Sequence, residues 1–445
     1  MAWGADRCKP RTQTSSEALL SRDDLTLPGR HDSRLVIPVN SSRFQAPRVS
    51  QIAALLAMAV PALQAQTGDP QLLLARRILR TTPLVDGHND LPWRIREDSA
   101  LSRDVEAYDL RRPTPGHTDL ARLRKGMVGA QFWSVYVPGE WRDSGYARVQ
   151  LEQLDIAKRV IAKYPEALRL VTTAAGVRAA FAAGRIGSLL GMEGGHVIEN
   201  SIGALRAYYD MGARYLTLTH NVTLDWADAA LDSARHDGLT RFGREVVREM
   251  NRLGMLVDLS HVSPATMSDA LTVTEAPVMF SHSAARGLVN HPRNVPDSIL
   301  VRVARNGGVV MVPFVPTFLS RARRDWADSS EVWRSSHPRP AVTIADVADH
   351  IDHIRHVAGA SHVGIGADFD GITDTVEGLE DVASYPLLFA ELARRGWTAV
   401  ELRQVAGENI LRVMTRAEAV AARLRRERPP ETRTIEQLDR PPGRP

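Results

Sequence analysis

The chain has almost no cysteine. Cys8 is the only one in 445 residues, so no disulfide can form within the chain and no metal site can be built from several thiolates. Any bound metal must therefore be held by histidine and carboxylate side chains. The lack of disulfides does not decide between the cytosol and an exported location.

Lysine is nearly absent as well. The chain has four lysines among 56 basic residues, so its positive charge is carried almost entirely by arginine. The arginines are interspersed with 52 acidic residues, and the formal net charge is only +4. Because no basic patch stands out, we do not expect the protein to bind nucleic acid.

Long apolar runs are missing too. The run Ile52–Val60 is too short to span a membrane and resembles the apolar region of a secretion signal, with a cleavage point near Ala65. We expect residues 1–66 to be a disordered leader containing a signal peptide, and the protein to be periplasmic or secreted. The alternative is a cytoplasmic protein with a disordered extension. Residues 426–445 are rich in proline and charge and are predicted to form a flexible tail without a membrane anchor.

Between these ends, residues 67–425 alternate short apolar runs with longer amphipathic segments. Leu239–Leu253 and Ile344–Val357 have helical periodicity, and eight runs have the length and composition of buried strands. The predicted strands are Pro83–Val85, Val128–Val137, Ser188–Met192, Tyr215–Thr219, Met255–Leu259, Pro277–Phe280, Gly308–Val312 and Val363–Gly366. This order predicts one α/β domain, a TIM-like (β/α)8 barrel. An open doubly wound sheet is the alternative, but no glycine-rich dinucleotide motif follows an early strand.

Ionisable residues gather at the carboxyl ends of the predicted strands, where active sites of this barrel lie. His88 and Asp90 follow the first strand, and on extended chain a His-x-Asp pair directs both side chains to one side, where they can bind one metal. The ends of five further strands carry Glu193, His220, His261, His282 and Asp368. Burying so many ionisable groups together is unfavourable unless metal or substrate compensates them, so the sequence predicts a metal site.

Taken together, these motifs resemble the membrane dipeptidase (renal dipeptidase) family of zinc peptidases. The likeness runs from about residue 70 to about 420. It is carried by Val85–Pro92, Gly191–Gly194, Leu216–Asn221, Val257–His261, Phe280–Ser283, Arg293–Asp297 and Gly364–Gly371.

The resemblance implies a metallo-dipeptidase, a homodimer, with two zinc ions in each chain. One zinc is expected on His88 and Asp90 and the other on His261 and His282, with Glu193 bridging them. The same resemblance places His220, Arg293 and Asp368 on the substrate.

The expected reaction is hydrolysis of a dipeptide by a hydroxide that bridges the metals, and some family members accept a D-residue at the second position. We expect His220 to stabilise the oxyanion and Arg293 to hold the C-terminal carboxylate. Asp368 is expected to orient the water or the amino group and to pass a proton to the leaving amine, while its division of labour with Glu193 stays open. Catalysis is thus assigned to Glu193, His220 and Asp368.

Two other functions remain open at this point. The first is an N-acyl-amino-acid deacylase or another amidohydrolase on the same scaffold, and the second is a non-catalytic binding protein. The second predicts a lost metal ligand, and none is lost. Phe318 stands where family members often carry tyrosine, which leaves the side-chain specificity open.

Several other polar residues are not assigned to the site. We expect His350, His353 and His356 to be solvated or at an interface, and His117 and Asp119 to cap a helix. The remaining ones are left open between the site and ordinary packing: His196, Trp226 and Asp228.

Overall fold

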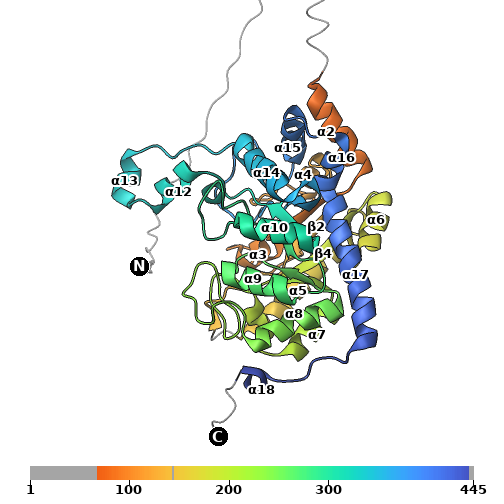
Figure 1. Cartoon of the computed structure of the whole chain (residues 1–445). Coiled ribbons are helices and arrows are strands. Elements are labelled where there is room, and N and C mark those ends of the chain that lie inside the picture. The colour runs from red at the N-terminus through yellow and green to blue at the C-terminus, as the bar shows by residue number, and fades with distance from the viewer. Residues whose placement is uncertain (1–67, 143–144, 440–445) are drawn as a thin grey trace, which may run out of the picture. The chain divides into compact units, whose positions relative to one another are not determined.

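The computed structural model describes residues 68–142 and 145–439, and in them a barrel of parallel strands is surrounded by helices (Figure 1). Pairing of β2 with β4 closes the ring, so the predicted (β/α)8 barrel is confirmed and the open sheet is excluded. The eight barrel strands are β1 (Leu84–Asn89), β2 (Val128–Ser134), β4 (Ile186–Glu193), β5 (Ala213–Thr217), β6 (Leu256–Asp258), β7 (Met279–Phe280), β8 (Val309–Val312) and β9 (Val363–Ile365). A short further strand, β3 (Leu168–Leu170), pairs with the start of β4.

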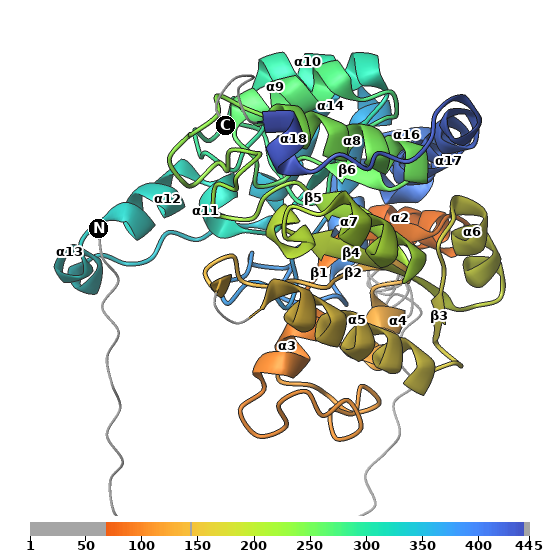
Figure 2. The ribbon, with the colours of Figure 1, turned by 90° about the horizontal axis from the view of Figure 1, so that it is seen from below.

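Helices connect each strand to the next on the outside of the barrel. The two helices predicted from periodicity are present as α8 (Arg241–Leu253) and α14 (Ile344–Ala358). The others are α2 (Pro70–Thr81), α3 (Leu91–Glu97), α4 (Leu120–Lys125), α5 (Tyr146–Lys163), α6 (Ala174–Ala182), α7 (Ile202–Asp210), α9 (Pro264–Val273), α10 (Asp297–Asn306), α11 (Pro316–Leu319), α12 (Arg321–Asp328), α13 (Glu331–Ser336), α15 (Tyr385–Arg394), α16 (Ala399–Arg403), α17 (Asn409–Glu427) and α18 (Ile435–Asp439). Figure 2 shows α12 and α13 extending away from the barrel.

Alternation along the strands separates two apolar layers. In β4, Leu189 belongs to the inner cluster, whereas Leu190 and Met192 belong to the larger cluster that includes the surrounding helices. Ile410 of α17 joins the inner cluster and closes the barrel at the amino ends of the strands. Because side chains alternate along a strand, Glu193 at the carboxyl end of β4 points to the same side as Leu189, into the barrel.

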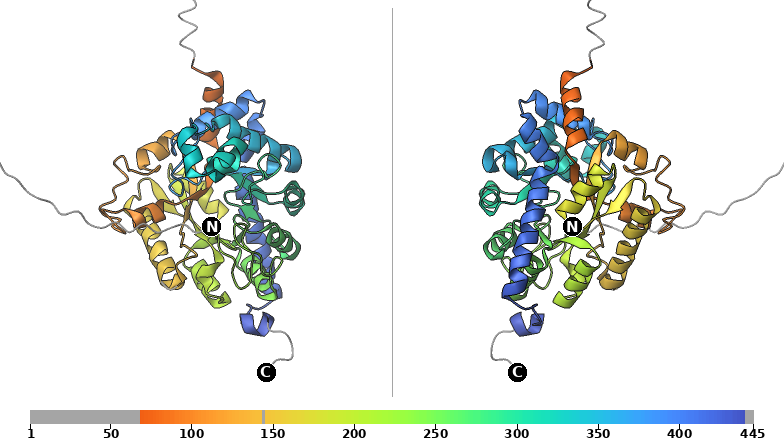
Figure 3. Two further views of the ribbon diagram at one scale, coloured as in Figure 1. Left: turned by 90° about the vertical axis from the view of Figure 1, so that its left-hand side faces the viewer. Right: turned by 90° about the vertical axis from the view of Figure 1, so that its right-hand side faces the viewer.

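The C-terminal region differs from the predicted flexible tail. Helix α17 continues through Glu427 along one side of the barrel, and α18 follows beyond its end (Figure 3). Leu438 of α18 is buried, and the Asp439 carboxylate accepts a hydrogen bond from the backbone N–H of Phe242 in the first turn of α8. An acidic group at a helix N-terminus is favourable, and this contact was hidden in a sequence dominated by proline and charge.

The prediction that the α14 histidines are solvated or lie at an interface is wrong for His350. His350 is buried on the same face as Val347 and Ile351, since residues three and four apart share one side of a helix. Its Nδ1 accepts from the backbone N–H of Ala285, and its Nε2 lies 3.2 Å from a backbone carbonyl oxygen. His356 is exposed, as expected.

No helix in the described part of the chain is both long and apolar enough to cross a membrane. The apolar run at 52–60, predicted to belong to a signal peptide, lies outside the described residues.

We predict that Gly126→Ala destabilises the fold by about 1–3 kcal/mol, as overpacking a tight site does. Gly126 ends α4 with an ordinary φ of −74°, but a Cβ there would lie 1.7 Å from the Val382 carbonyl oxygen. Gly203 in α7 is the matched control, because its nearest neighbouring atom would be 3.4 Å away. Urea unfolding of the metal-free variants measures both, and an equal loss of stability would contradict this packing.

Candidate metal centre and substrate cavity

The eight residues predicted from the sequence meet at the carboxyl ends of the barrel strands. Seven of them line one cavity of about 610 Å³, and the eighth, His88, is fully buried next to them. The eight are His88, Asp90, Glu193, His220, His261, His282, Arg293 and Asp368.

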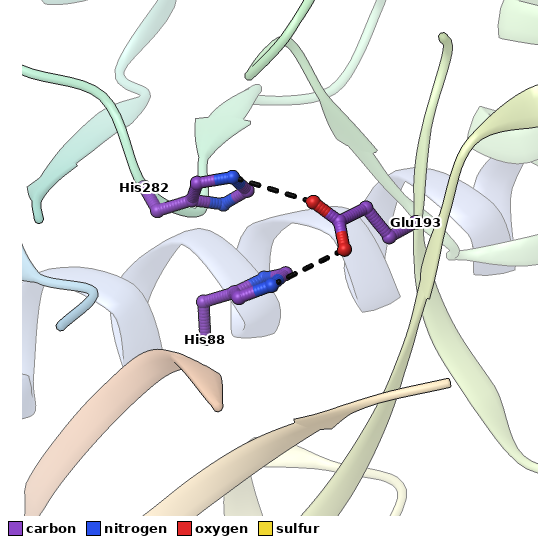
Figure 4. A group of neighbouring side chains, drawn as sticks. All are labelled: His88, Glu193 and His282. Atoms are coloured by element: carbon purple, nitrogen blue, oxygen red, sulfur yellow. Dashed lines mark ion pairs between the residues drawn. The ribbon is translucent and has the colours of Figure 1, made fainter. Parts of the chain in front are cut away.

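Glu193, the last residue of β4, lies between two groups of histidines. Its Oε2 is 3.4 Å from Nε2 of His88, and its Oε1 is 2.9 Å from Nε2 of His261 and 3.4 Å from Nε2 of His282. Figure 4 shows His88 and His282 facing different oxygens of this carboxylate. A carboxylate in this arrangement can offer one oxygen to each of two metal ions.

His88 also faces two aspartates. Its Nε2 lies 3.1 Å from Oδ2 of Asp90 and 3.9 Å from Oδ1 of Asp368. Nε2 of His88 and Oδ1 of Asp90 are buried and form no hydrogen bond. Buried polar atoms normally have a partner, so these two fit a site built for a cation.

Three overlapping groups of side chains have nitrogen and oxygen ligands within 4.8 Å of one another. They are His88, Glu193 and His282; Glu193, His220 and His261; and His88, Asp90 and Asp368. Imidazole nitrogen and carboxylate oxygen are ligands that Zn²⁺ prefers. The groups include His220 and Asp368, which the sequence analysis assigned to substrate rather than to metal.

Hydrogen bonds at Nδ1 orient two of the histidines. Nδ1 of His261 lies 3.0 Å from the amide oxygen of Asn221, and Nδ1 of His282 lies 2.8 Å from Oγ of Ser281. Ser281 donates its hydroxyl proton to Asp258 at 2.6 Å, so it accepts from His282. Both rings therefore carry the proton on Nδ1 and present an unprotonated Nε2, which is the state that a metal ligand requires.

A glycine in β4 makes room for the support of His88. A Cβ at Gly191 would lie 2.0 Å from Cζ of Tyr215, whose hydroxyl is 2.9 Å from Nδ1 of His88. Asp86 accepts from the backbone N–H groups of His88 and Ala367, which ties the ends of β1 and β9 together. These contacts fix the position of the His88 ring.

The backbone is strained at two cavity residues that follow their strands. His261 and Asp368 have φ values of 68° and 69°, a left-handed conformation that costs a non-glycine residue about 1–3 kcal/mol. A Cβ at Gly371 would lie 2.3 Å from Oδ2 of Asp90 and 2.8 Å from Oδ1 of Asp368. The strained φ of Asp368 and the missing side chain of Gly371 thus allow the carboxylates of Asp90 and Asp368 to lie close together.

Burial shifts the protonation of the site. Burial and the charge of Arg293 hold the pKa values of His261 and His282 well below the usual range, which keeps both rings neutral. Burial, with the charges of Asp90 and Glu193 nearby, raises the pKa of Asp368 to about 8. Burial lowers the pKa of Arg293 to about 10, so Arg293 stays charged at neutral pH.

The cavity also includes residues that the sequence analysis missed. Asp119 caps α4 as expected, but His117 does not. Nδ1 of His117 accepts from the backbone N–H of Asp370, and His117 and Asp370 both line the cavity. Tyr136 lies next to His220, with ring centroids 4.8 Å apart. Tyr136 follows β2 at the same end of the barrel, so its place was readable from the strand pattern, whereas the loop carrying His117 gave no such signal.

The residues left open pack away from the cavity. Trp226 is fully buried against Phe242, and Asp228 accepts backbone hydrogen bonds within its own loop. Nε2 of His196 lies 2.9 Å from the carbonyl oxygen of Val137. None of the three lines the cavity.

Comparison with known proteins gives one family. The family model described as membrane dipeptidase (peptidase family M19) matches residues 73–428.

Solved structures of that kind resemble the chain over most of its length. A metallo-peptidase of family M19 described as dipeptidase AC is 27% identical, with a TM-score of 0.66, over 76% of this chain and 99% of its own. A metallo-peptidase from Rhodobacter sphaeroides, bound to a phosphinate mimic of the dipeptide L-Ala-D-Ala, is 26% identical with a TM-score of 0.65 over 76% and 99%. The probable dipeptidase PvdM from Pseudomonas aeruginosa is 20% identical with a TM-score of 0.71 over 79% and 99%, and supports the fold alone.

We predict that zinc stabilises the chelator-treated protein through these ligands. A ligand at a thousand times its Kd adds about 4 kcal/mol to the free energy of unfolding, because it binds only the folded state. Glu193→Gln should lose most of this gain, whereas His356→Gln, at an exposed histidine of α14, should keep it. Thermal unfolding with and without zinc measures the difference, and an unchanged gain in Glu193→Gln would refute the site.

Proposed function

The chain belongs to the membrane dipeptidase family, peptidase family M19, and is a metallo-dipeptidase; we propose that it uses two zinc ions bridged by Glu193 to hydrolyse dipeptides. The observation that carries this proposal is the position of Glu193, whose two oxygens face different histidines inside one cavity. Each oxygen then has its own set of nitrogen and oxygen neighbours, as a bridging ligand needs.

The ligands divide into two groups in this proposal. His88 and Asp90 hold one ion, and His261 and His282 hold the other. The 3.1 Å between Nε2 of His88 and Oδ2 of Asp90, and the 2.9 Å between Nε2 of His261 and Nε2 of His282, support the two pairs. When bound, two zinc ions would polarise the peptide carbonyl and activate a water for attack.

Three side chains act on the dipeptide itself. His220, whose Nε2 lies 3.9 Å from Oε1 of Glu193, donates to the carbonyl oxygen as negative charge develops on it. One contact of this kind is typically worth about 3–4 kcal/mol. Asp368, with its pKa raised to about 8, holds the amino group or the water and exchanges a proton near neutral pH.

Arg293 binds the C-terminal carboxylate of the dipeptide. Its Nε is buried without a hydrogen-bond partner, and its Cζ lies 5.1 Å from the ring centroid of Phe318. Phe318 in turn packs on His291, so the guanidinium rests on an aromatic surface with donors free for a carboxylate. Phe318 has no hydroxyl to offer the substrate.

Acceptance of a D-residue at the second position is part of the proposal. The relative from Rhodobacter sphaeroides was solved with a mimic of L-Ala-D-Ala, and it matches this chain over its barrel. Zinc as the native metal, the homodimer and export remain predictions.

We predict that Arg293→Met raises KM for unmodified dipeptides at least about 30-fold, because a charge-assisted carboxylate contact worth roughly 2 kcal/mol or more is lost. The assay is a panel of dipeptides with the second residue in L and D forms, together with their N-acylated counterparts, on protein of measured metal content. Turnover of N-acylated substrates in preference to free dipeptides would replace the dipeptidase with a deacylase. Two equivalents of zinc without turnover of either would favour a binding protein.

We predict that Asp368→Asn lowers kcat at least about 100-fold, within the range that a positioned acid–base group contributes. Its zinc content should stay the same, because the proposed ligand pairs do not include Asp368. Metal analysis beside steady-state kinetics separates the two effects. Loss of one zinc from Asp368→Asn would instead make Asp368 a metal ligand.

A further inference from the structure

The cavity has a second arginine that the proposed mechanism does not use. Arg94, on the helix that follows β1, lines the cavity and is half-buried. Its Nε is buried without a hydrogen-bond partner, and its guanidinium forms no ion pair with any described residue. A buried donor without a partner is unfavourable, so this guanidinium is suited to an anionic group that arrives with the substrate.

The surroundings hold the Arg94 side chain in place. A Cβ at Gly116 would lie 2.2 Å from Oδ1 of Asp370 and 3.3 Å from Cγ of Arg94, so this glycine lets the loop pack closely on both side chains. The next residue, His117, accepts through Nδ1 from the backbone N–H of Asp370, which leaves the proton on Nε2. This wall of the cavity therefore presents two donors, Arg94 and His117.

Neither of the two acids near this wall forms an ion pair with Arg94. Asp370, which also lines the cavity, accepts through Oδ1 from the backbone N–H of His117. Glu97 is on the same helix, three residues after Arg94, and also lines the cavity, but it is exposed and forms no ion pair with Arg94. An exposed carboxylate is well solvated and adds little to a site of this kind.

The strand order sets which end of a dipeptide lies beside Arg94. Asp368 follows β9, which pairs directly with β1, and Asn89 at the end of β1 is bridged to Phe369, the residue after Asp368. Arg293 follows β7, which is separated from β1 by β8 and β9. With the amino group at Asp368 and the carboxylate at Arg293, the first residue of the dipeptide lies on the side of Arg94.

We propose that Arg94 makes the enzyme prefer dipeptides whose first residue has an acidic side chain, aspartate or glutamate. This inference rests on the proposed dipeptidase function and on the orientation that Arg293 and Asp368 give the substrate. His117 assists by donating from Nε2 to the same carboxylate.

The test compares substrates that differ in charge but hardly in size. L-Asp-L-Ala and L-Glu-L-Ala are assayed against freshly prepared L-Asn-L-Ala and L-Gln-L-Ala, with L-Ala-L-Ala, L-Lys-L-Ala and L-Ala-L-Asp beside them. We expect kcat/KM to favour the acid over the amide at least about tenfold, mostly through KM, and to do so less at high ionic strength. Arg94→Gln should bring the acid-to-amide ratio to within about twofold of one.

The matched control is Arg112→Gln, which removes a positive charge from the loop that also carries His117. The Arg112 side chain is 84% exposed and does not line the cavity, so the acid-to-amide ratio should not change. Four results would each overturn the inference while leaving the dipeptidase activity intact. Two concern the wild type: an acid-to-amide ratio near one, or a preference for L-Lys-L-Ala. The others are an acid preference only at the second position, and an acid-to-amide ratio that does not change in Arg94→Gln. Failure to hydrolyse any dipeptide would overturn both.

Discussion

The structure of the site depends on one buried carboxylate. Glu193 ends β4 pointing into the barrel, and three histidines, one near the end of β1 and two just after β6 and β7, turn their Nε2 atoms toward it. A buried carboxylate beside several imidazoles is unfavourable unless protons or cations neutralise its charge. In the proposed function, this carboxylate is the ligand that two metal ions would share.

The surrounding structure serves that arrangement. Ser281 and Asn221 fix the rings of His282 and His261 with the lone pair of Nε2 directed inward. Gly191 has no side chain, which leaves room for the Tyr215 ring to reach His88. Gly191 and Tyr215 are on strands β4 and β5, Ser281 directly follows β7, and Asn221 lies in the loop after β5. Supports on or next to rigid elements hold the proposed ligands in position before any metal arrives.

Around this centre, the strand order determines where the two arginines of the cavity lie. Arg293 and Arg94 both line the cavity, Arg293 after β7 and Arg94 after β1, and β8 and β9 lie between these two strands. A dipeptide carries charges at both ends, so in the proposed function Arg293 at its carboxylate and Asp368 at its amino group would fix its direction. The second arginine then acts on what the first residue carries, which is how a common scaffold acquires its own specificity.

The sequence was sufficient for the barrel and for the residues that its strands place. Each ionisable group that follows a strand, such as Glu193 or His261, could be located because parallel strands end at one rim. His117 could not be found in this way, because a loop brings it to the cavity from far along the chain. The burial of His350 and the packing of α18 were not predicted for a related reason. Local composition does not show which distant residues will form hydrogen bonds with a polar or proline-rich segment.

Whether Glu193 bridges two zinc ions is tested most directly by a crystal structure of the zinc-loaded protein, with anomalous diffraction recorded on both sides of the zinc edge. Two anomalous peaks are expected, one between Glu193 and His88 and one between Glu193 and the pair His261 and His282. A single peak, or peaks that do not contact Glu193, would contradict the bridging role.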